Sequence, residues 1–187
     1  MAVGRFVEKK APELTLLAFL KVRQEVPDAR LVMIGDGPLR GPCQRICRAL
    51  GLEEAVALPG AEPPPVVAAR LRRARAFVQH SVTALDGDAE GTPVSVLEAS
   101  ACGLPVVATR HAGIKDVVEE GRTGLLVDEG DVEGMARHLL DLARDPALAA
   151  RLGRAGRERI ERHFSMDASI GKLWAVIDGV RGKMEKA

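Results

Sequence analysis

The stretch Leu31-Val32-Met33-Ile34-Gly35-Asp36-Gly37-Pro38 is an unbroken apolar run that stops at two glycines and a proline. A strand that is buried on both faces lacks alternation of polar and apolar residues, and this run lacks it. Such strands are typical of a parallel sheet that is covered by helices on both faces. The run therefore predicts a central strand over residues 31–34, followed by a tight turn.

Similar short runs recur along the chain, separated by stretches with helical periodicity. Further strands are expected at 2–4, 56–58, 76–78, 105–108 and 125–127. Helices are expected at 12–26, 39–50, 64–74, 93–102, 113–120, 131–144, 147–163 and 167–182. This alternation predicts an α/β fold, a Rossmann-like parallel sheet with helices on both faces and extra helices at the C-terminus.

Composition excludes several classes of protein. The 187 residues are 47% hydrophobic and 28% charged, which suits one domain with a proper core. Because 27 basic residues nearly balance 26 acidic ones and aromatic residues make up only 3%, no nucleic-acid partner is expected. No apolar run reaches the roughly 20 residues of a membrane span, and Met1–Gly4 does not resemble a signal peptide. Three cysteines without an export signal predict a reducing, cytoplasmic compartment.

The stretch from Glu90 to Glu98 carries the most chemical information. Thr92 is a good N-cap and Pro93 suits a first helical position, so a helix is expected to begin here. Gly91 lets a ligand approach the backbone, and the free N–H groups of a helix start attract anions such as a diphosphate. Two carboxylates that flank such a site suit a nucleotide sugar, which carries hydroxyl groups on both sides of its diphosphate. The alternative is that Glu90 is an ordinary loop acid and Glu98 an ordinary solvated residue, since two carboxylates eight positions apart are common.

Other candidate residues have structural explanations of equal or greater weight. Cys43 and Cys47 lie one helical turn apart without further ligands, which favours core packing over zinc, and no metal site is expected. The turn at 35–37 lacks the third glycine of a dinucleotide fingerprint. His80 and His111 follow strands at the edge where ligands bind, and each is either a ligand of the sugar or a hydrogen-bonded structural residue.

The order of several motifs resembles the C-terminal, donor-binding half of family 4 (group 1) retaining glycosyltransferases, which have the GT-B fold. The matching segments cover nearly the whole chain: Val3-Gly4-Arg5 with Lys9-Lys10, Ile34-Gly35-Asp36-Gly37-Pro38, His80-Ser81, Glu90-Gly91-Thr92-Pro93 through Leu97-Glu98-Ala99, 101–109 and 121–127. The segments at 79–83 and 86–88 further resemble bacterial members that build extracellular polysaccharides.

The resemblance assigns roles to individual residues. It implies that Arg5 and Lys10 neutralise the diphosphate of the donor, and that Glu90 contacts hydroxyl groups of the donor sugar. It also implies that Glu98 binds the ribose. Further donor contacts are expected from Gly4, His80, Gly91, Thr92, Pro93 and Val94. The nucleotide-diphospho-sugar is a substrate, and no cofactor or metal is expected because the two cations stabilise the leaving group.

The chain departs from the family pattern at three positions. Ala11 and Ala112 stand where glycine is common, and Asp116 replaces a frequent glutamate. Extra Cβ atoms at 11 and 112 are expected to restrict the backbone near the donor. These departures put the level of activity in question more than the fold.

The resemblance also predicts the domain organisation. Residues 1–165 are expected to form the nucleotide-sugar-binding domain, and residues 166–187 a helix that crosses to an N-terminal GT-B domain that this chain lacks. The isolated chain is therefore expected to be inactive, and Leu173 and Trp174 to lack their partner, which favours self-association. The arginines near the C-terminus have two explanations. They form either an ordinary solvated face or a surface by which the complete enzyme associates peripherally with a membrane.

Three functional hypotheses follow. The first is a donor-binding domain for hexosyl transfer. The second is a non-catalytic interaction or structural module derived from the same fold, which the missing half and the substitutions at 11, 112 and 116 motivate. A sugar-nucleotide epimerase ranks last because its acid–base residues cannot be placed.

Overall fold

The computed structural model describes residues 1–184, with side chains through residue 178. Within them lie six short strands: β1 (Ala2–Val3), β2 (Leu31–Ile34), β3 (Val56–Gly60), β4 (Phe77–Gln79), β5 (Val106–Thr109) and β6 (Gly124–Val127). They form two three-stranded sheets, ordered β1-β2-β3 and β4-β5-β6, and every strand pair is parallel. The parallel architecture predicted from the apolar runs is thus confirmed.

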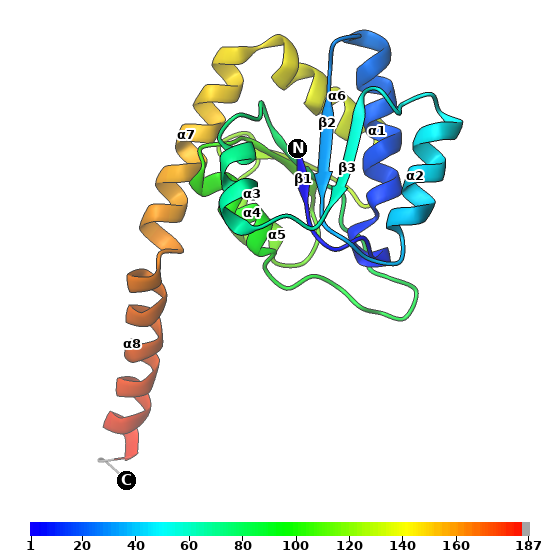
Figure 1. The fold of residues 1–187 in the computed structure, drawn as a ribbon. Coiled ribbons are helices and arrows are strands. Elements are labelled where there is room, and N and C mark those ends of the chain that lie inside the picture. Colours follow the sequence, from blue (N-terminus) through cyan, green and yellow to red (C-terminus); the bar gives the residue numbers. More distant parts are fainter. Residues whose placement is uncertain (185–187) are drawn as a thin grey trace.

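The two sheets are joined at the first residue. The Met1 amino group donates a hydrogen bond to the Ala76 carbonyl oxygen (2.8 Å), and the Val78 N–H donates one to the Met1 carbonyl oxygen (2.9 Å). The strands therefore lie in the spatial order 3-2-1-4-5-6, and the sequence in which successive strands are added changes side between β1 and β4. Figure 1 shows β3, β2 and β1 side by side. In open α/β sheets, ligands bind at the carboxyl ends of the strands beside such a change of side.

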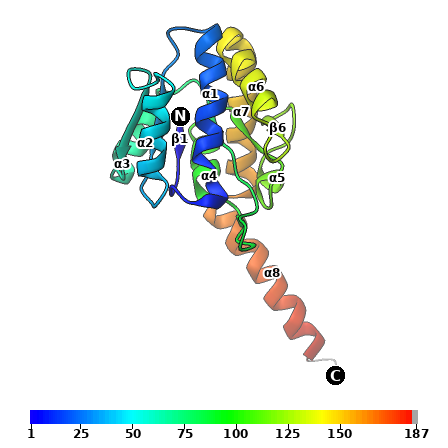
Figure 2. The same ribbon diagram turned by 90° about the vertical axis from the view of Figure 1, so that its right-hand side faces the viewer.

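Helices cover both faces of this arrangement (Figures 1 and 2). Their bounds are η1 (Glu8–Lys10), α1 (Pro12–Glu25), α2 (Arg40–Ala49), α3 (Pro64–Leu71), α4 (Val94–Ala101), α5 (Ile114–Val117), α6 (Val132–Arg144), α7 (Pro146–His163) and α8 (Met166–Met184). One apolar core packs α1, α2 and α6 on one face, and a second packs α3, α4, α5 and the end of α7 on the other. Cys43 and Cys47 are buried in the first core, as the sequence predicted.

Several expected bounds need correction. The helix expected at 113–120 ends at Val117, because residues 119–123 form a turn in which the Thr123 hydroxyl accepts from the Glu119 N–H (2.8 Å). The helix expected at 64–74 ends at Leu71 and continues as a turn. The other helices lie within two residues of their expected bounds.

The Gly35-Asp36-Gly37 turn packs directly against the segment that follows β1. A Cβ atom at Gly35 would lie 1.9 Å from the Gly4 carbonyl oxygen, and one at Gly37 would lie 2.5 Å from that of Phe6. Both glycines have positive φ, +138° and +151°. The segment is thus the tight turn that the sequence predicts after β2, and it packs closely against the backbone on both sides of Arg5.

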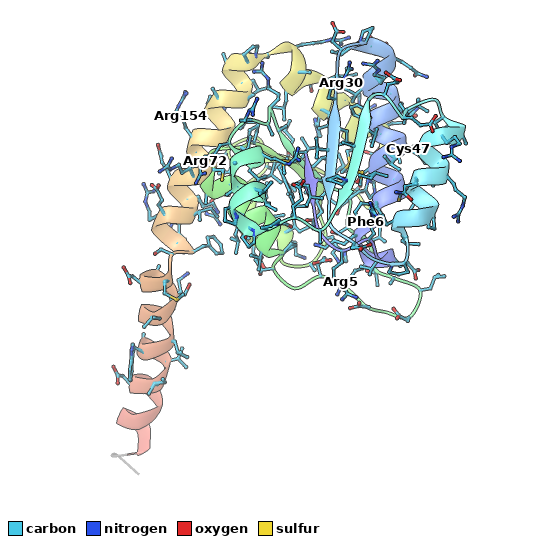
Figure 3. All side chains as sticks on the ribbon, in the orientation of Figure 1. Arg5, Phe6, Arg30, Cys47, Arg72 and Arg154 are labelled. Atoms are coloured by element: carbon cyan, nitrogen blue, oxygen red, sulfur yellow. The ribbon has the colours of Figure 1, made fainter. Side chains whose placement is uncertain are left out.

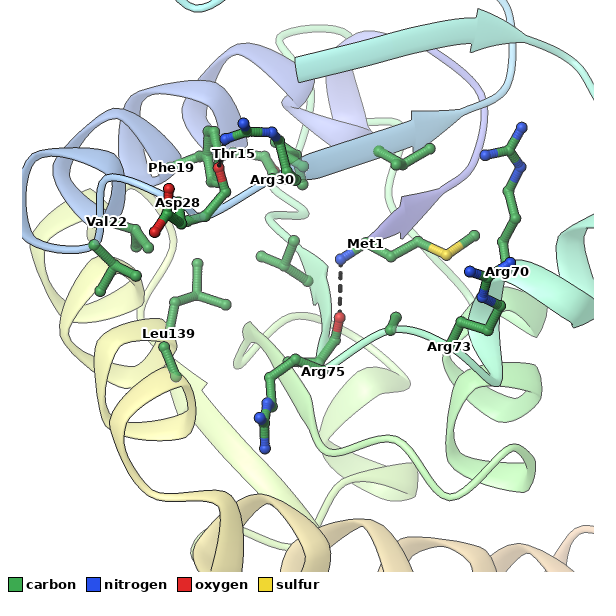
Figure 4. Close-up of a pocket in the computed structure, with 18 residues that line it drawn as sticks. Met1, Thr15, Phe19, Val22, Asp28, Arg30, Arg70, Arg73, Arg75 and Leu139 are labelled. Carbon is green, nitrogen blue, oxygen red and sulfur yellow. Dashed lines mark hydrogen bonds between the residues drawn. The ribbon is translucent and has the colours of Figure 1, made fainter. Parts of the chain in front are cut away.

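A hollow of about 620 Å³ lies at the opposite, amino-terminal ends of β2 and β4 (Figure 4). It is lined mostly by apolar side chains, including Phe19 and Leu139, and several arginines surround it. Burial lowers the pKa of the Met1 amino group at its edge to about 5. The hollow is thus remote from the strand ends at which ligands are expected.

Helix α8 extends away from the domain (Figures 1 and 2). Its apolar side chains are exposed, with Leu173 at 60% and Trp174 at 56%, as the sequence predicted. The last three residues of the expected 166–187 segment lie outside the described residues. Among residues 1–184, no helix is both long and apolar enough to cross a membrane.

Candidate functional site

The carboxyl ends of β1, β4, β5 and β6 bring four loops together. Residues 82–90, referred to below as the 82–90 loop, follow β4 and turn back toward η1. Contacts with η1 hold this loop: Lys9 Nζ pairs with Asp88 (2.9 Å) and donates to the Ala89 carbonyl (3.2 Å), Leu85 N–H donates to Glu8 (2.8 Å), and Val82 N–H donates to the Lys9 carbonyl (3.0 Å). The predicted site residues after β1 and before α4 are thereby brought side by side.

Lys10 and Glu90 form an ion pair at the centre of this region. The Lys10 Nζ lies 3.1 Å from Glu90 Oε2, and the two side chains are 15% and 8% exposed. Burial lowers the pKa of Lys10, while the neighbouring Glu90 carboxylate opposes that shift. The other carboxylate oxygen, Glu90 Oε1, is buried and has no hydrogen-bond partner among the described residues. One oxygen of Glu90 is thus held by a cation, and the other is available to accept a hydrogen bond.

Arg5 lies at the same end of the molecule and is exposed (Figure 3). Gly4 and Arg5 line a crevice of about 30 Å³ together with Lys10 and Gln79. That volume is about one water molecule, so the strand ends are packed and a larger ligand would lie on their outer surface. Arg5 and Lys10, the two cations that the resemblance assigns to the diphosphate, therefore line the same crevice.

The start of α4 differs by one residue from the prediction. Pro93 has an extended ψ of 119° and occupies the N-cap position, and no side chain caps the helix, so Thr92 is not the N-cap. The reason is that the Pro93 carbonyl already accepts from the Val96 N–H (3.0 Å), which makes Val94 the first helical residue. Among the described residues, the N–H groups of Val94 and Ser95 have no acceptor, and they remain available to an anion.

A close backbone contact fixes the segment before α4. The Gly113 N–H donates to the Gly91 carbonyl (3.1 Å), and a Cβ atom at Gly113 would lie 2.7 Å from that oxygen and 2.7 Å from Thr92 Oγ1. Glycine is therefore required at 113 for the loops to meet.

Glu98 stands apart from this cluster. It lies in the second turn of α4 and is exposed, and its side chain makes no hydrogen bond or ion pair with the described residues. No contact of its side chain supports the ribose-binding role, which therefore rests on the resemblance alone.

His80 is fully buried, with 0% exposure. Its Nε2 accepts from the Gly130 N–H (2.9 Å), while Nδ1 has no partner among the described residues. Burial lowers the pKa of His80 to about 4. This geometry favours the alternative of a neutral structural histidine that joins the end of β4 to the loop after β6.

Two groups at the site lie outside the residues to which the resemblance assigns roles: the sequence leaves His111 as either a ligand of the sugar or a structural residue, and it gives Gln79 no individual role. The buried His111 contacts the backbone of Glu90 and the carboxylate of Glu129. Gln79 donates to Ser81 Oγ (2.9 Å) and accepts from Ser95 Oγ (3.0 Å), which ties β4 to α4. The only signal in the sequence was the position of these residues at strand ends.

Within the part of the chain that is described, no group of three or more His, Cys, Asp or Glu side chains is placed to hold a metal ion. The site offers cations and backbone N–H groups instead. These are ligands for phosphate oxygens, and Glu90 Oε1 is an acceptor for a hydroxyl group.

Comparisons with known proteins place this arrangement in a family. The model for "Glycosyl transferases group 1" matches residues 1–159. A GDP-mannose-dependent alpha-(1-6)-phosphatidylinositol monomannoside mannosyltransferase of Mycolicibacterium smegmatis is 36% identical over 168 residues, which is 89% of this chain and 43% of that protein. The amylovoran biosynthesis glycosyltransferase AmsK of Erwinia amylovora is 32% identical over 178 residues, 95% of this chain and 44% of AmsK.

The fold has close counterparts among solved structures. The C-terminal domain of a glycosyl transferase group 1 family protein (LpcC) from Francisella tularensis superposes with a TM-score of 0.78 at 19% identity, covering 88% of this chain and 85% of that domain. The chain spans less than half the length of the two curated relatives. From these matches and the parallel-sheet architecture, the chain belongs to the group 1 glycosyltransferases and corresponds to the C-terminal half of their GT-B fold.

Proposed function

We propose that this chain is the donor-binding half of a retaining glycosyltransferase that transfers a hexosyl unit from a nucleotide-diphospho-sugar in polysaccharide biosynthesis. The observation that carries the proposal is the Lys10–Glu90 pair beside the start of α4, with Glu90 Oε1 buried and unpartnered among the described residues. A hydroxyl group of the donor sugar would donate to that oxygen and so remove the cost of leaving it unpaired.

The charges around the pair suit a diphosphate. Glu90 neutralises Lys10 in the unliganded chain, so attraction of the anion depends on Arg5 and on the free N–H groups of Val94 and Ser95. As the glycosidic bond breaks, negative charge grows on the departing diphosphate, and these groups with Lys10 would stabilise it. In this scheme the protein itself stabilises the leaving group, and no metal ion is needed.

The remaining contacts follow from the resemblance. The backbone at Gly91–Val94 would lie against the distal phosphate, together with Gly4, and Glu98 would bind the ribose. His80 would act through the loop that it holds, because its ring is fully buried.

Residues 1–165 would form the donor domain, and α8 would reach toward an N-terminal GT-B domain. The exposed apolar side chains of α8 support this arrangement. Because acceptor binding would need that other domain, we expect the isolated chain to bind the donor without transferring sugar.

Calorimetric titration of the chain with GDP, GDP-mannose, UDP and UDP-glucose tests the proposal. Saturable binding of one nucleotide series, weakened in Glu90→Gln, is expected. No binding at millimolar ligand in a folded chain would reject the donor-site assignment and favour a non-catalytic module. A Glu98→Gln variant with unchanged affinity would remove Glu98 from the site.

A further inference from the structure

His111 connects three loops at the candidate site, although it is only 3% exposed. Its Nε2 lies 3.0 Å from the backbone nitrogen of Glu90, and its Nδ1 lies 2.5 Å from Glu129 Oε1. The second oxygen of Glu129 accepts from the Thr83 N–H (3.0 Å). One imidazole and one carboxylate thus join the loops that follow β4, β5 and β6.

The direction of each hydrogen bond follows from chemistry. A backbone N–H only donates, so the Nε2 that faces Glu90 must be unprotonated. The proton of the neutral ring then lies on Nδ1 and is donated to Glu129. This bond lowers the pKa of Glu129, so the carboxylate stays ionised and keeps the proton of His111 on Nδ1. Glu129 therefore selects the tautomer that Glu90 requires.

Lys9 Nζ holds Asp88 and Ala89, and the Gly113 N–H holds the Gly91 carbonyl, but the Glu90 N–H between them has only His111 as an acceptor among the described residues. Most of the 82–90 loop is exposed, and Leu85 at its tip is 98% exposed. The Glu90 side chain meets Lys10, but the Glu90 N–H has His111 as its acceptor. Loss of that acceptor would leave a half-buried donor unpaired, and the loop would move to satisfy it.

We propose that His111 is a positioning residue: through Nε2 it fixes the backbone of Glu90, so that the carboxylate stays beside Lys10 with Oε1 turned to the donor sugar. The proposal rests on the proposed function of Glu90. His111 itself touches no substrate atom in this scheme. Glu129 acts one step further away, by fixing the tautomer and orientation of the ring.

Two amide substitutions separate this role from a merely structural one. In His111→Gln, the amide oxygen can take the place of Nε2 and accept from Glu90. In His111→Asn, the shorter side chain can take the place of Nδ1 and donate to Glu129, but it leaves the Glu90 N–H without an acceptor. A positioning role needs the contact with the Glu90 N–H, which only His111→Gln keeps. Simple bridging of the loops needs the contact with Glu129, which His111→Asn keeps.

The readout is the contribution of the sugar to affinity, taken as the ratio of the dissociation constants of GDP and GDP-mannose, and likewise of UDP and UDP-glucose. For whichever series binds, His111→Asn is expected to lower the ratio at least about fivefold, which is the effect of losing one hydrogen bond. Affinity for the nucleoside diphosphate alone should change less than about twofold, and His111→Gln should retain most of the native ratio. Equal ratios in His111→Asn and the native chain, or equal losses in both variants, would overturn the proposal.

Hydrogen exchange of the Glu90 amide in the free chain makes the test independent of the ligand. Exchange in His111→Asn should be about tenfold faster than in the native chain, and exchange in His111→Gln close to native. Absence of all nucleotide binding would reject the proposed function of the site. Unchanged exchange at Glu90 in His111→Asn would instead reject the positioning role of His111.

Discussion

Lys10 and Glu90 are eighty residues apart in the chain, yet Lys10 Nζ lies 3.1 Å from Glu90 Oε2 in a largely buried ion pair. Removal of one partner leaves an uncompensated charge in a poorly solvated place. We expect Lys10→Met to lower the free energy of unfolding by about 2–4 kcal/mol. Urea denaturation measures this change.

The double variant Lys10→Met/Glu90→Gln is the matched control for that prediction. Because it removes both charges, its cost should be smaller than the sum of the two single costs by about 1–3 kcal/mol. Additive costs would mean that the pair is not coupled in solution.

Arg5 should matter for the ligand and not for the fold. It is exposed, so Arg5→Ala should change the free energy of unfolding by less than about 0.5 kcal/mol. Loss of one charge-assisted hydrogen bond to the diphosphate should weaken binding of the nucleoside diphosphate about tenfold or more. Arg72→Ala, an exposed arginine after α3, serves as the control in the same calorimetric titration (Figure 3). Equal effects of the two substitutions would reduce the role of Arg5 to general electrostatics.

Ala11 and Ala112 adopt positive φ, at +35° and +41°, where a Cβ atom is unfavourable. Their positions beside Lys10 and His111 are those where the family pattern favours glycine. Both alanines thus adopt a backbone conformation that favours glycine, despite their Cβ atoms.

Glycine at these positions should relieve that strain. A residue in the left-handed region costs about 1–2 kcal/mol, and part of the gain is offset by the greater freedom of glycine in the unfolded chain. Ala11→Gly is therefore expected to raise the free energy of unfolding by about 0.5–1 kcal/mol. The exposed helical Ala150→Gly should lower it by about 1 kcal/mol. Thermal or urea unfolding compares the two, and destabilisation by both would contradict the assignment of strain at Ala11.

Stability should fall in mild acid because of His80. Its pKa is about 4 in the folded chain and near 6.5 when unfolded, so the unfolded state binds more protons between these values. The free energy of unfolding is therefore unaffected by this histidine above pH 6.5 and decreases as the pH falls toward 4. We expect a loss of about 2 kcal/mol between pH 7 and 5 from this residue.

His80→Gln isolates that effect, since the amide oxygen can still accept from the Gly130 N–H. The Met1 amino group, with a pKa lowered to about 5, changes stability in the same direction but is common to both proteins. The difference between their unfolding free energies should therefore narrow or reverse as the pH falls. A constant difference would mean that His80 does not resist protonation.

The strands were predictable because burial on both faces demands unbroken apolar runs, and the run at 31–34 coincides with β2. Rules that consider only neighbouring residues predicted the loops less accurately than the strands. Thr92 has the chemistry of an N-cap, but the Pro93 carbonyl accepts from the Val96 N–H, so Pro93 takes that position.

The site itself depends on contacts between distant residues. Nothing local in the sequence pairs Lys10 with Glu90, or His111 with Glu129, because these contacts arise only when parallel strands align their carboxyl ends. The types of residue at the strand ends predicted which edge of the sheet holds the site. The partner of each side chain could be identified only from the three-dimensional structure.

Met1 has one further consequence, for the cooperativity of the fold. Its backbone nitrogen donates to the Ala76 carbonyl and its carbonyl accepts from the Val78 N–H, so one residue couples the two three-stranded sheets at the edge of the hollow. Any change that displaces this backbone would therefore loosen both halves of the molecule together, and with them the alignment of the strand ends that bear Arg5 and Glu90.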